Sequence, residues 1–234
     1  MVKILDGKEV AASIIRDCAE HVSEIVTSGA LAPKLTVICV GENSSNDSYL
    51  KGIQNKAAEA GVLVSVENLS KDISFDELKD LINELNEDEK VNGILLMRPL
   101  PGELKEKEAE ICECIAAEKD VDAARQLSVA GAYLGNNAFA PCTAESCMAI
   151  LKHYDIDIAG KKVVVIGRSL VVGKPVANML LNENATVTVC HSKTKNMQSI
   201  TKKADIVVVA TGTPKMFNEK FFSKGQIVVD AGIN

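Results

Sequence analysis

Short runs of mostly aliphatic residues recur along this sequence and alternate with segments of helical spacing. Such runs are typical of strands buried on both faces, as in a parallel sheet. Seven strands are expected, at residues 35–40, 62–66, 93–97, 163–166, 185–190, 206–210 and 227–230. Because strands and helices alternate, the pattern predicts an α/β fold whose strands pair in parallel.

Helices are indicated where apolar residues recur every three or four positions. The first is expected at residues 8–27, and Ser74 with Glu77 predicts a capping box for another helix that runs to Leu85. Three more are expected at residues 48–60, 103–117 and 143–154, the last with Thr143 as its N-cap. Residues 123–140 show little periodicity of either kind.

The turn after strand 163–166 is the first candidate binding site. Gly167 ends the strand, and Gly173 stands where the next helix would begin. In such a strand–turn–helix unit, backbone N–H groups and the helix dipole can face a phosphate. The spacing differs from the usual G-x-G-x-x-G, because Ser169 takes the place of the middle glycine and Gly173 comes one residue late. The pattern favours a nucleotide site, although glycines at such positions can also serve packing alone.

The next strand favours NADP over NAD as the nucleotide. An NAD-binding unit usually ends this strand in Asp or Glu, which binds the ribose 2′-hydroxyl. Here the strand ends in Cys190-His191-Ser192, followed by Lys193 and Lys195. Arg168 lies in the first turn, where a cation suits a 2′-phosphate. The alternative is that Arg168 and the lysines are solvated surface charge.

Two later strands end in small residues, Thr211-Gly212 and Ala231-Gly232. Small side chains there leave room for a ligand along the carboxyl edge of the sheet. The pattern predicts two domains, residues 1–142 and residues 143–234, of which the second is a Rossmann-type nucleotide-binding domain. A length of 234 residues is enough for two modest domains with proper cores.

Composition narrows the class of function. A net charge of −6 does not suggest a nucleic-acid partner. The N-terminus lacks the features of a signal peptide, and no apolar run is long enough to span a membrane. The seven cysteines occur without the spacing of a metal site. We therefore expect a cytoplasmic protein with reduced thiols and with no membrane, nucleic-acid or metal partner.

Three clusters in the first half fall at the ends of strands or in the turns that follow. They are Tyr49, the segment 97–101, and the pair Asp120 and Asp122. Each has a plain structural interpretation: packing, a rigid turn, or solvated carboxylates. Together they border one edge of one sheet, which is where α/β proteins bind ligands.

In this order the motifs resemble the methylenetetrahydrofolate dehydrogenase/cyclohydrolase family. The resemblance runs almost from end to end of the chain, through Tyr49, Gly93-Ile94-Leu95 with Pro99-Leu100-Pro101, Lys119-Asp120-Val121-Asp122, Pro141-Cys142-Thr143, residues 165–169 with Val172-Gly173-Lys174-Pro175, His191-Ser192, and residues 230–234. It implies an N-terminal α/β folate-binding domain, a C-terminal NADP-binding domain, tetrahydrofolate derivatives as substrates, and a homodimer. It also implies a glycine- and proline-rich segment that this sequence lacks after Asn234.

The resemblance also assigns roles to residues. Tyr49 would line the folate rings, and Asp122 would accept hydrogen bonds from the amidine-like edge of the pterin, as suits a carboxylate. The substrate-binding residues are expected to be Tyr49, Ile53, Met97, Pro99, Leu100 and Asp122. The cofactor-binding residues are expected to be Thr143, Gly167, Arg168, Ser169, Val172, Gly173, His191, Ser192, Thr211, Gly212 and Ile233.

Two positions depart from the family pattern. The bifunctional enzymes have a lysine four residues after the tyrosine and a glutamine just before the turn, where this sequence has Ile53 and Met97. The lysine and glutamine serve hydrolysis, in which water adds to the methenyl carbon and protons move. Lys56 is seven residues after Tyr49 and lies on nearly the same helix face, about 4.5 Å farther along the helix axis than position 53. It is a candidate substitute for the missing lysine.

We therefore expect NADP-dependent oxidation of 5,10-methylene- to 5,10-methenyltetrahydrofolate, with cyclohydrolase activity weak or missing. The candidate catalytic residues are Tyr49, Asp122 and Lys56. Two alternatives stay open. One is another NADP-dependent dehydrogenase of the same two-domain plan, resembling shikimate dehydrogenase. The other is a nucleotide-binding remnant without activity.

Overall fold

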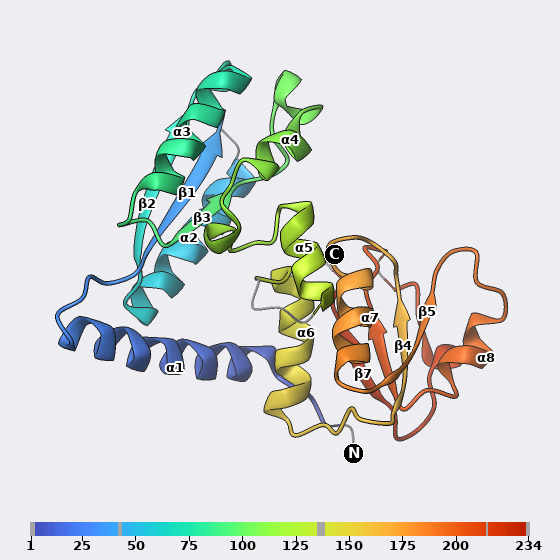
Figure 1. Cartoon of the computed structure of the whole chain (residues 1–234). Coiled ribbons are helices and arrows are strands. Elements are labelled where there is room, and N and C mark those ends of the chain that lie inside the picture. Colours follow the sequence, from blue (N-terminus) through green and yellow to red (C-terminus); the bar gives the residue numbers. More distant parts are fainter. Residues whose placement is uncertain (1–2, 42–43, 135–138, 214, 233–234) are drawn as a thin grey trace. The chain divides into compact units, whose positions relative to one another are not determined.

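The computed structural model describes residues 3–41, 44–134, 139–213 and 215–232, and they form two compact units (Figure 1). One unit is Gly7–Ser128. The other begins at Val129 and also includes the short segment that precedes Gly7. The predicted α/β class with parallel strands is confirmed. The expected boundary between residues 142 and 143 stays a prediction.

The unit Gly7–Ser128 is built on a parallel sheet in the order β2-β1-β3. Its strands are β1 (Lys34–Val40), β2 (Leu63–Leu69) and β3 (Gly93–Leu96). Its helices are α1 (Gly7–Thr27), α2 (Ser44–Ala60), α3 (Phe75–Glu87), η1 (Gly102–Lys105), α4 (Glu108–Glu113) and η2 (Ala117–Lys119). The strand order reverses between β1 and β3, so the carboxyl edge of this sheet has a switch point between these strands.

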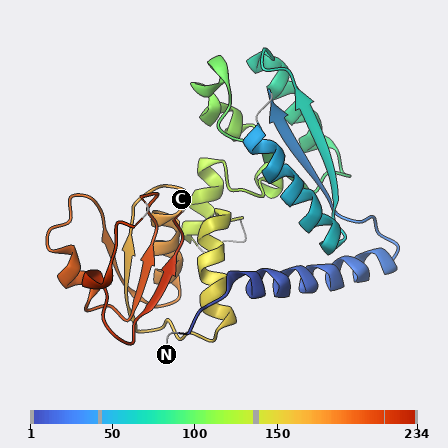
Figure 2. The ribbon, with the colours of Figure 1, turned by 180° about the vertical axis from the view of Figure 1, so that it is seen from behind.

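The two faces of this sheet are covered by different helices, as the opposite views in Figures 1 and 2 show. Ile38, Ile94 and Leu96 point to one face, where they pack with residues of α3 and α4. Val37, Cys39 and Met97 form a cluster on the other face, against which Leu50 and Ile53 of α2 pack. Because alternate residues of β1 are buried on opposite faces, the strand has the continuous apolar run that the sequence shows.

The segment after η2 runs beside β3. Asp120 forms an isolated parallel bridge with Ile94, and Val121 lies against Gly93, where a Cβ atom would come within 2.6 Å of Val121 Cγ1. A side chain at position 93 would therefore push this segment away. Because the bridge is parallel, the chain runs from Asp120 beside Ile94 to Asp122 in the direction of the carboxyl end of β3.

The second unit contains a parallel sheet in the order β5-β4-β6-β7. Its strands are β4 (Lys162–Ile166), β5 (Thr186–Cys190), β6 (Ile206–Val209) and β7 (Ile227–Asp230). Helices α6 and α7 pack on one face and α8 on the other. The helices after residue 125 are α5 (Gln126–Leu134), α6 (Cys142–His153), α7 (Gly173–Asn182), α8 (Met197–Thr201) and η3 (Glu219–Phe221).

The segment before Gly7 is attached to this second unit. The Asp6 N–H donates to the hydroxyl of Tyr154 at 2.8 Å, and the Lys3 ammonium lies 5.3 Å from the centre of the Tyr154 ring. The unit is therefore discontinuous in sequence, which a linear domain boundary does not anticipate.

Several predicted elements differ from the structure. The predicted helix at residues 103–117 is divided into η1 and α4, and α2 begins at Ser44. Neither α5 nor α8 is among the expected elements. The sequence of α5, QLSVAGAYL, is apolar or small at almost every position, so it has no polar face to produce a helical period.

The prediction that Thr143 is the N-cap of α6 is wrong, because Pro141 occupies that position. The carbonyl of Pro141 accepts from the Ala144 and Glu145 N–H groups at 2.8 and 3.1 Å. A proline has no N–H to satisfy and its fixed φ suits a helix start, so the helix begins before the threonine.

Candidate functional site

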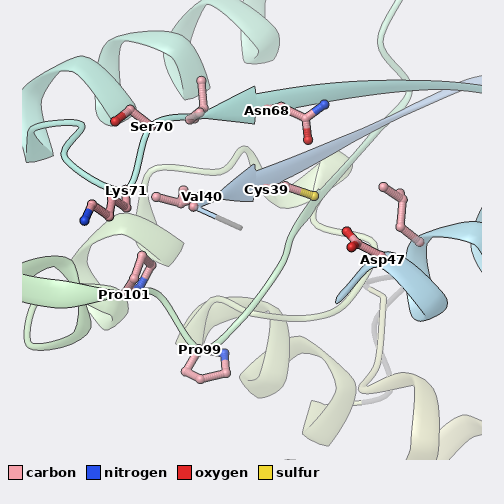
Figure 3. Close-up of a pocket in the computed structure, with 11 residues that line it drawn as sticks. Cys39, Val40, Asp47, Asn68, Ser70, Lys71, Pro99 and Pro101 are labelled. Carbon is pink, nitrogen blue, oxygen red and sulfur yellow. The ribbon is translucent and has the colours of Figure 1, made fainter. Parts of the chain in front are cut away.

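A cleft of about 850 Å³ opens at the carboxyl edge of the sheet β2-β1-β3. Residues that follow all three strands line it, among them Gly41 after β1, Ser70 and Lys71 after β2, and Pro99 after β3. Figure 3 shows the side chains of Lys71 and Asp47 on opposite sides of this cleft. The cleft lies at the switch point, where α/β proteins bind ligands.

Helix α2 carries three of the predicted site residues. The side chain of Tyr49 is 61% exposed, so a planar ligand can reach its ring. Ile53 packs against the apolar cluster of Val37, Cys39 and Met97. Lys56 Nζ instead donates to both carboxylate oxygens of Glu59, at 2.7 and 3.0 Å, and this ion pair is exposed to solvent. The structure therefore gives Lys56 a surface partner on its own helix.

The turn after β3 brings Met97, Pro99 and Leu100 to the same edge. Met97 is 6% exposed, and its N–H donates to the Ile38 carbonyl at 2.9 Å, extending the pairing with β1. Pro99 lines the cleft, and the Arg98–Pro99 peptide bond is cis. The Leu100 side chain belongs to the core on the α3 face, while its N–H donates to Glu108 Oε2 at 2.7 Å.

The two aspartates of the segment Lys119–Asp122 have different surroundings. Asp120 is fully buried, and its two carboxylate oxygens accept from the Ala124 and Arg125 N–H groups at 2.9 and 3.0 Å. Asp122 is half-buried and accepts from Arg98 Nη2 at 3.0 Å. Asp120 thus stabilises the turn that follows it, and Asp122 is the carboxylate that a ligand can reach.

Two thiols near this edge are protonated at neutral pH. Burial, with a smaller contribution from the negative charge of Asp47, raises the pKa of the Cys39 thiol above its ordinary value. Burial also raises the pKa of the Cys112 thiol to about 11, although the nearby charge of Arg98 works in the opposite direction. Since the thiolate is the nucleophile, neither cysteine suits covalent chemistry. The described part of the chain also contains no group of three or more metal-ligating side chains.

The second candidate region is the carboxyl edge of the sheet β5-β4-β6-β7. Its strand order reverses between β4 and β6, and Gly167 lies at this switch point with φ of +131°. A Cβ atom on Gly167 would collide with the Ala210 carbonyl oxygen, and one on Gly173 would collide with the Gly167 carbonyl oxygen. Both glycines are therefore required for packing within the protein, whether or not a ligand is bound.

Arg168 and Ser169 occupy the turn itself. Ser169 Oγ accepts from the Val172 and Gly173 N–H groups at 3.1 and 3.3 Å, so the hydroxyl fixes the first turn of α7. Arg168 is exposed, and no hydrogen bond or ion pair to another described residue holds its side chain. The Gly167 N–H donates to the Cys190 carbonyl at 2.8 Å, which brings Arg168 close to the end of β5.

The end of β5 presents His191 and Ser192. His191 Nδ1 accepts from the Lys193 N–H at 3.1 Å, and the His191 N–H donates to Thr194 Oγ1 at 2.8 Å. These bonds form a tight turn, leaving Ser192 exposed. Among the described residues near this turn, the charged side chains are those of Arg168, Lys193 and Lys195. All three are cations, as a phosphate site requires.

The end of β6 contributes Thr211 and Gly212. Thr211 Oγ1 is buried and has no hydrogen-bond partner among the described residues, whereas buried hydroxyls are normally bonded. A Cβ on Gly232, after β7, would come within 2.5 Å of the Thr211 carbonyl oxygen, so these turns pack closely. The unsatisfied hydroxyl at the switch edge fits a site completed by a ligand. The predicted cofactor contact Ile233 lies outside the described residues.

Most of the predicted residues gather at two sheet edges, one in each unit. Among the residues predicted for folate, Pro99 lines the cleft at the first edge, Met97 directly follows β3, Asp122 is bonded to Arg98, and Tyr49 and Ile53 lie on α2. Gly167–Ser169, His191, Ser192, Thr211 and Gly212 follow the strands of the second sheet. Sequence reasoning gave no role to Arg98, Asp47 or Lys71, which also lie at the first edge. Arg98 directly follows a predicted strand, Asp47 directly precedes a predicted helix, and Lys71 lies in the loop between a predicted strand and helix. Charged residues are common at all such positions, so the sequence did not single these three out.

The fold and the two edges define a two-domain α/β protein with a nucleotide-binding second unit. The chain belongs to the tetrahydrofolate dehydrogenase/cyclohydrolase family. Residues 5–122 match the catalytic domain of this family, and residues 141–234 match its NAD(P)-binding domain. This membership removes the alternative of a dehydrogenase from another family of similar plan.

Relatives from distant organisms agree with this assignment. The bifunctional protein FolD of Clostridioides difficile is 43% identical over 233 residues, which cover 99% of this chain and 80% of the relative. The crystal structure of the bifunctional enzyme FolD, a methylenetetrahydrofolate dehydrogenase/cyclohydrolase from Campylobacter jejuni, has a TM-score of 0.92 at 39% identity, covering 99% of this chain and 82% of that one. The methylenetetrahydrofolate dehydrogenase-cyclohydrolase of Trypanosoma brucei was solved with NADP and an inhibitor. It has a TM-score of 0.87 at 32% identity, and the match covers 99% of this chain and 78% of that one.

Proposed function

We propose that this protein is an NADP-dependent methylenetetrahydrofolate dehydrogenase, which oxidises 5,10-methylene- to 5,10-methenyltetrahydrofolate. The observation that carries the proposal is that consecutive parts of one chain match the catalytic and the NAD(P)-binding domains of the family. The match includes both the catalytic domain and the NAD(P)-binding domain, whereas an isolated nucleotide-binding remnant would need to match only the NAD(P)-binding domain.

The folate half of the site is the cleft at the edge of β2-β1-β3. Tyr49 offers an exposed ring against which a pterin or aminobenzoyl ring can pack. Asp122 offers carboxylate oxygens for the paired N–H donors of the pterin. Asp120 cannot take this role, because its side chain is fully buried and holds the backbone N–H groups of Ala124 and Arg125.

The NADP half is the edge of β5-β4-β6-β7. Arg168 would bind the 2′-phosphate, with Ser192 beside it, and the turn 167–173 would face the diphosphate. Bound NADP would supply the acceptor for the hydride. Lys193 and Lys195 after β5 support NADP over NAD, as does the absence of Asp or Glu at the end of this strand.

The chemistry of the dehydrogenase step asks little of the side chains. The C–H bond of the methylene bridge breaks as a hydride leaves, and the lone pair of the adjacent nitrogen forms the new C=N bond. No side chain has to remove a proton, so the protein contributes orientation and exclusion of water. This agrees with a folate edge where the nearby thiols are protonated and Lys56 is paired on the surface.

Cyclohydrolase activity has other requirements. The relatives are named bifunctional, but for this chain we predict that the hydrolytic reaction is weak or missing. Ile53 and Met97, at the positions of the family's lysine and glutamine, belong to one apolar cluster. Neither side chain can guide water or move a proton, and general acid–base help of this kind contributes about 10²–10⁴-fold to a rate.

The test is the formation of NADPH from methylenetetrahydrofolate by the purified protein, with NAD in a parallel reaction. We expect turnover with NADP and a lower kcat/KM with NAD. The disappearance of methenyltetrahydrofolate, measured against the buffer rate, reports hydrolysis separately. A protein that reduces neither cofactor would return the interpretation to a remnant without activity.

We also propose a cellular context and an oligomeric state. One-carbon transfer with tetrahydrofolate derivatives fits a cytoplasmic homodimer. No helix in the described ranges is long and apolar enough to cross a membrane. Sedimentation equilibrium at micromolar protein concentration measures whether the mass is that of one chain or two.

A further inference from the structure

Arg98 is a charged residue at the folate edge to which the proposed function gives no role. Its Nη2 donates to Asp122 Oδ2 at 3.0 Å. The side chains of Arg98 and Asp122 are 28% and 33% exposed. The pair is therefore shielded enough to keep a defined geometry, yet open enough for a ligand to reach it.

The second oxygen of Asp122 remains available. Among the described residues, Oδ1 of Asp122 has no hydrogen-bond partner, in contrast to Asp120, both of whose oxygens accept from backbone N–H groups. An ionised carboxylate has about four acceptor positions. The bond from Arg98 uses one of these and leaves the others for a ligand.

The positive charge of Arg98 is favoured by neighbouring acidic groups. Burial opposes the charge of Arg98, yet its pKa is raised above the ordinary value by Cys112, which ionises only near its own raised pKa of about 11, and by Asp122 and Glu108. Glu108 is itself tied to the turn, since Oε2 accepts from the Leu100 N–H at 2.7 Å. The planar guanidinium of Arg98 is therefore a charged donor whose hydrogen-bond partner is Oδ2 of Asp122.

We propose that Arg98 is a positioning residue for the folate: by holding Oδ2 of Asp122, it orients the carboxylate so that the remaining lone pairs accept the paired N–H donors of the pterin. The inference rests on the proposed function, because it takes Asp122 as the acceptor of those donors. Arg98 does not act on the reacting carbon and works only through Asp122.

If Arg98 instead competed with the substrate for Asp122, Arg98→Leu would lower KM and Kd. A guanidinium and the 2-amino-4-oxo edge of a pterin offer the same paired N–H donors, so Arg98 could compete with the substrate for Asp122. A competitor of this kind would hold both carboxylate oxygens in a fork. A single Arg98–Asp122 hydrogen bond, made to Oδ2, joins the two side chains, which favours positioning.

The experiment compares Arg98→Leu, Arg98→Lys, Asp122→Asn and the double variant Arg98→Leu/Asp122→Asn with the unmodified protein. KM and kcat are measured with methylenetetrahydrofolate and NADP, and the Kd of tetrahydrofolate is measured by calorimetry without turnover. Arg125→Leu is the matched control, because Arg125 is also a partly buried arginine of this unit, 3.5 Å from Glu113. Thermal unfolding verifies that each variant is folded.

We expect Arg98→Leu to raise both KM and Kd by about tenfold, the effect of one lost charge-assisted bond, with a smaller change in kcat. Arg98→Lys should recover part of this loss, because it restores the charge but not the planar fork. In the Asp122→Asn background, Arg98→Leu should have no further effect on Kd. Arg125→Leu should leave KM and Kd unchanged within about twofold, an effect too small for a lost bond.

The outcomes separate the inference from the proposed function. If the unmodified protein turns over but Arg98→Leu leaves or lowers KM and Kd, Arg98 does not position Asp122, and the function stands. If the protein binds tetrahydrofolate in an Arg98-dependent way without reducing NADP, the inference stands and the activity is wrong. If it neither binds nor turns over, both are wrong. An equal effect of Arg98→Leu with and without Asp122 would also overturn the inference.

Discussion

At the scale of single residues, the departure of Ile53 and Met97 from the family pattern is explained by packing. Met97 is nearly fully buried with Val37 and Cys39, and Ile53 packs against the same cluster. Position 53 is only partly buried, whereas a glutamine at position 97 would be a buried polar group among apolar neighbours. Such a group costs about 1–3 kcal/mol.

The paired substitution Ile53→Lys with Met97→Gln should restore hydrolysis. We expect methenyltetrahydrofolate to disappear near the buffer rate with the unmodified protein, and at least about tenfold faster with the double variant, at the low end of general acid–base effects. Folding stability, measured by urea unfolding, should fall by about 1–3 kcal/mol for Met97→Gln alone. Rapid hydrolysis by the unmodified protein that Lys56→Ala abolishes would show that Lys56 has taken the role despite its pairing with Glu59.

Arg168 is the residue on which the choice of cofactor depends. It is exposed at the end of β4 and beside the end of β5. Replacing Arg168 with alanine should weaken NADP by roughly 1.5–3 kcal/mol, the value of a hydrogen bond to a charged group, and change NAD little. The measurement is kcat/KM for each cofactor, with the exposed Lys203→Ala as the control. Equal or better use of NAD by the unmodified protein contradicts the assignment.

At the scale of elements, the sequence predicted a helix or strand correctly where a short pattern of residues is typical of a single structure. Ser74 and Glu77 form the expected capping box, and the apolar runs became the seven strands. Helix α5 escaped prediction because its residues are nearly uniform in polarity, and the N-cap of α6 was misplaced because Pro141 competes with Thr143. Arg98 could not be assigned from sequence, because its partner Asp122 is distant along the chain.

The capping box also predicts a pH dependence of stability. The hydroxyl and then the backbone N–H of Ser74 donate to the Glu77 carboxylate and lower the pKa of Glu77 below its ordinary 4.5. A lowered folded-state pKa stabilises the protein above the ordinary value, and the contribution is lost as the pH falls through the folded-state value. Ser74→Ala should cost about 1 kcal/mol at neutral pH.

The cost of Ser74→Ala should become smaller at about pH 3, below the ordinary pKa of glutamate. Urea unfolding at the two pH values measures this change. In a Glu77→Gln background, which cannot titrate, Ser74→Ala should cost the same at both. A cost that stays constant with pH in the unmodified background would mean that Glu77 contributes nothing through its charge.

At the scale of the whole molecule, each unit has its own cores and its own sheet edge. One group of clusters includes Ile38, Leu78 and Met97, and the other includes Val165, Val208 and Cys190. The alternation of strands and helices was sufficient to predict two parallel sheets and their carboxyl edges. The attachment of the residues before Gly7 to the second unit was not predictable, because it depends on Tyr154, whose partner is remote in sequence.

The assignment of one ligand to each edge predicts where each ligand protects the backbone. A ligand present at about 100 times its Kd stabilises the folded state by about 2.7 kcal/mol, which slows the exchange of amide hydrogens that open with the site. NADP should protect the segments 166–174 and 190–194, and tetrahydrofolate the segments 37–41 and 97–122. Hydrogen–deuterium exchange with mass spectrometry measures both, with NAD at the same concentration as the control for the 2′-phosphate. Weaker protection by NAD, confined to the same segments, is expected. Protection of segment 37–41 by NADP alone, with none at 166–174, would show that the nucleotide is assigned to the wrong sheet.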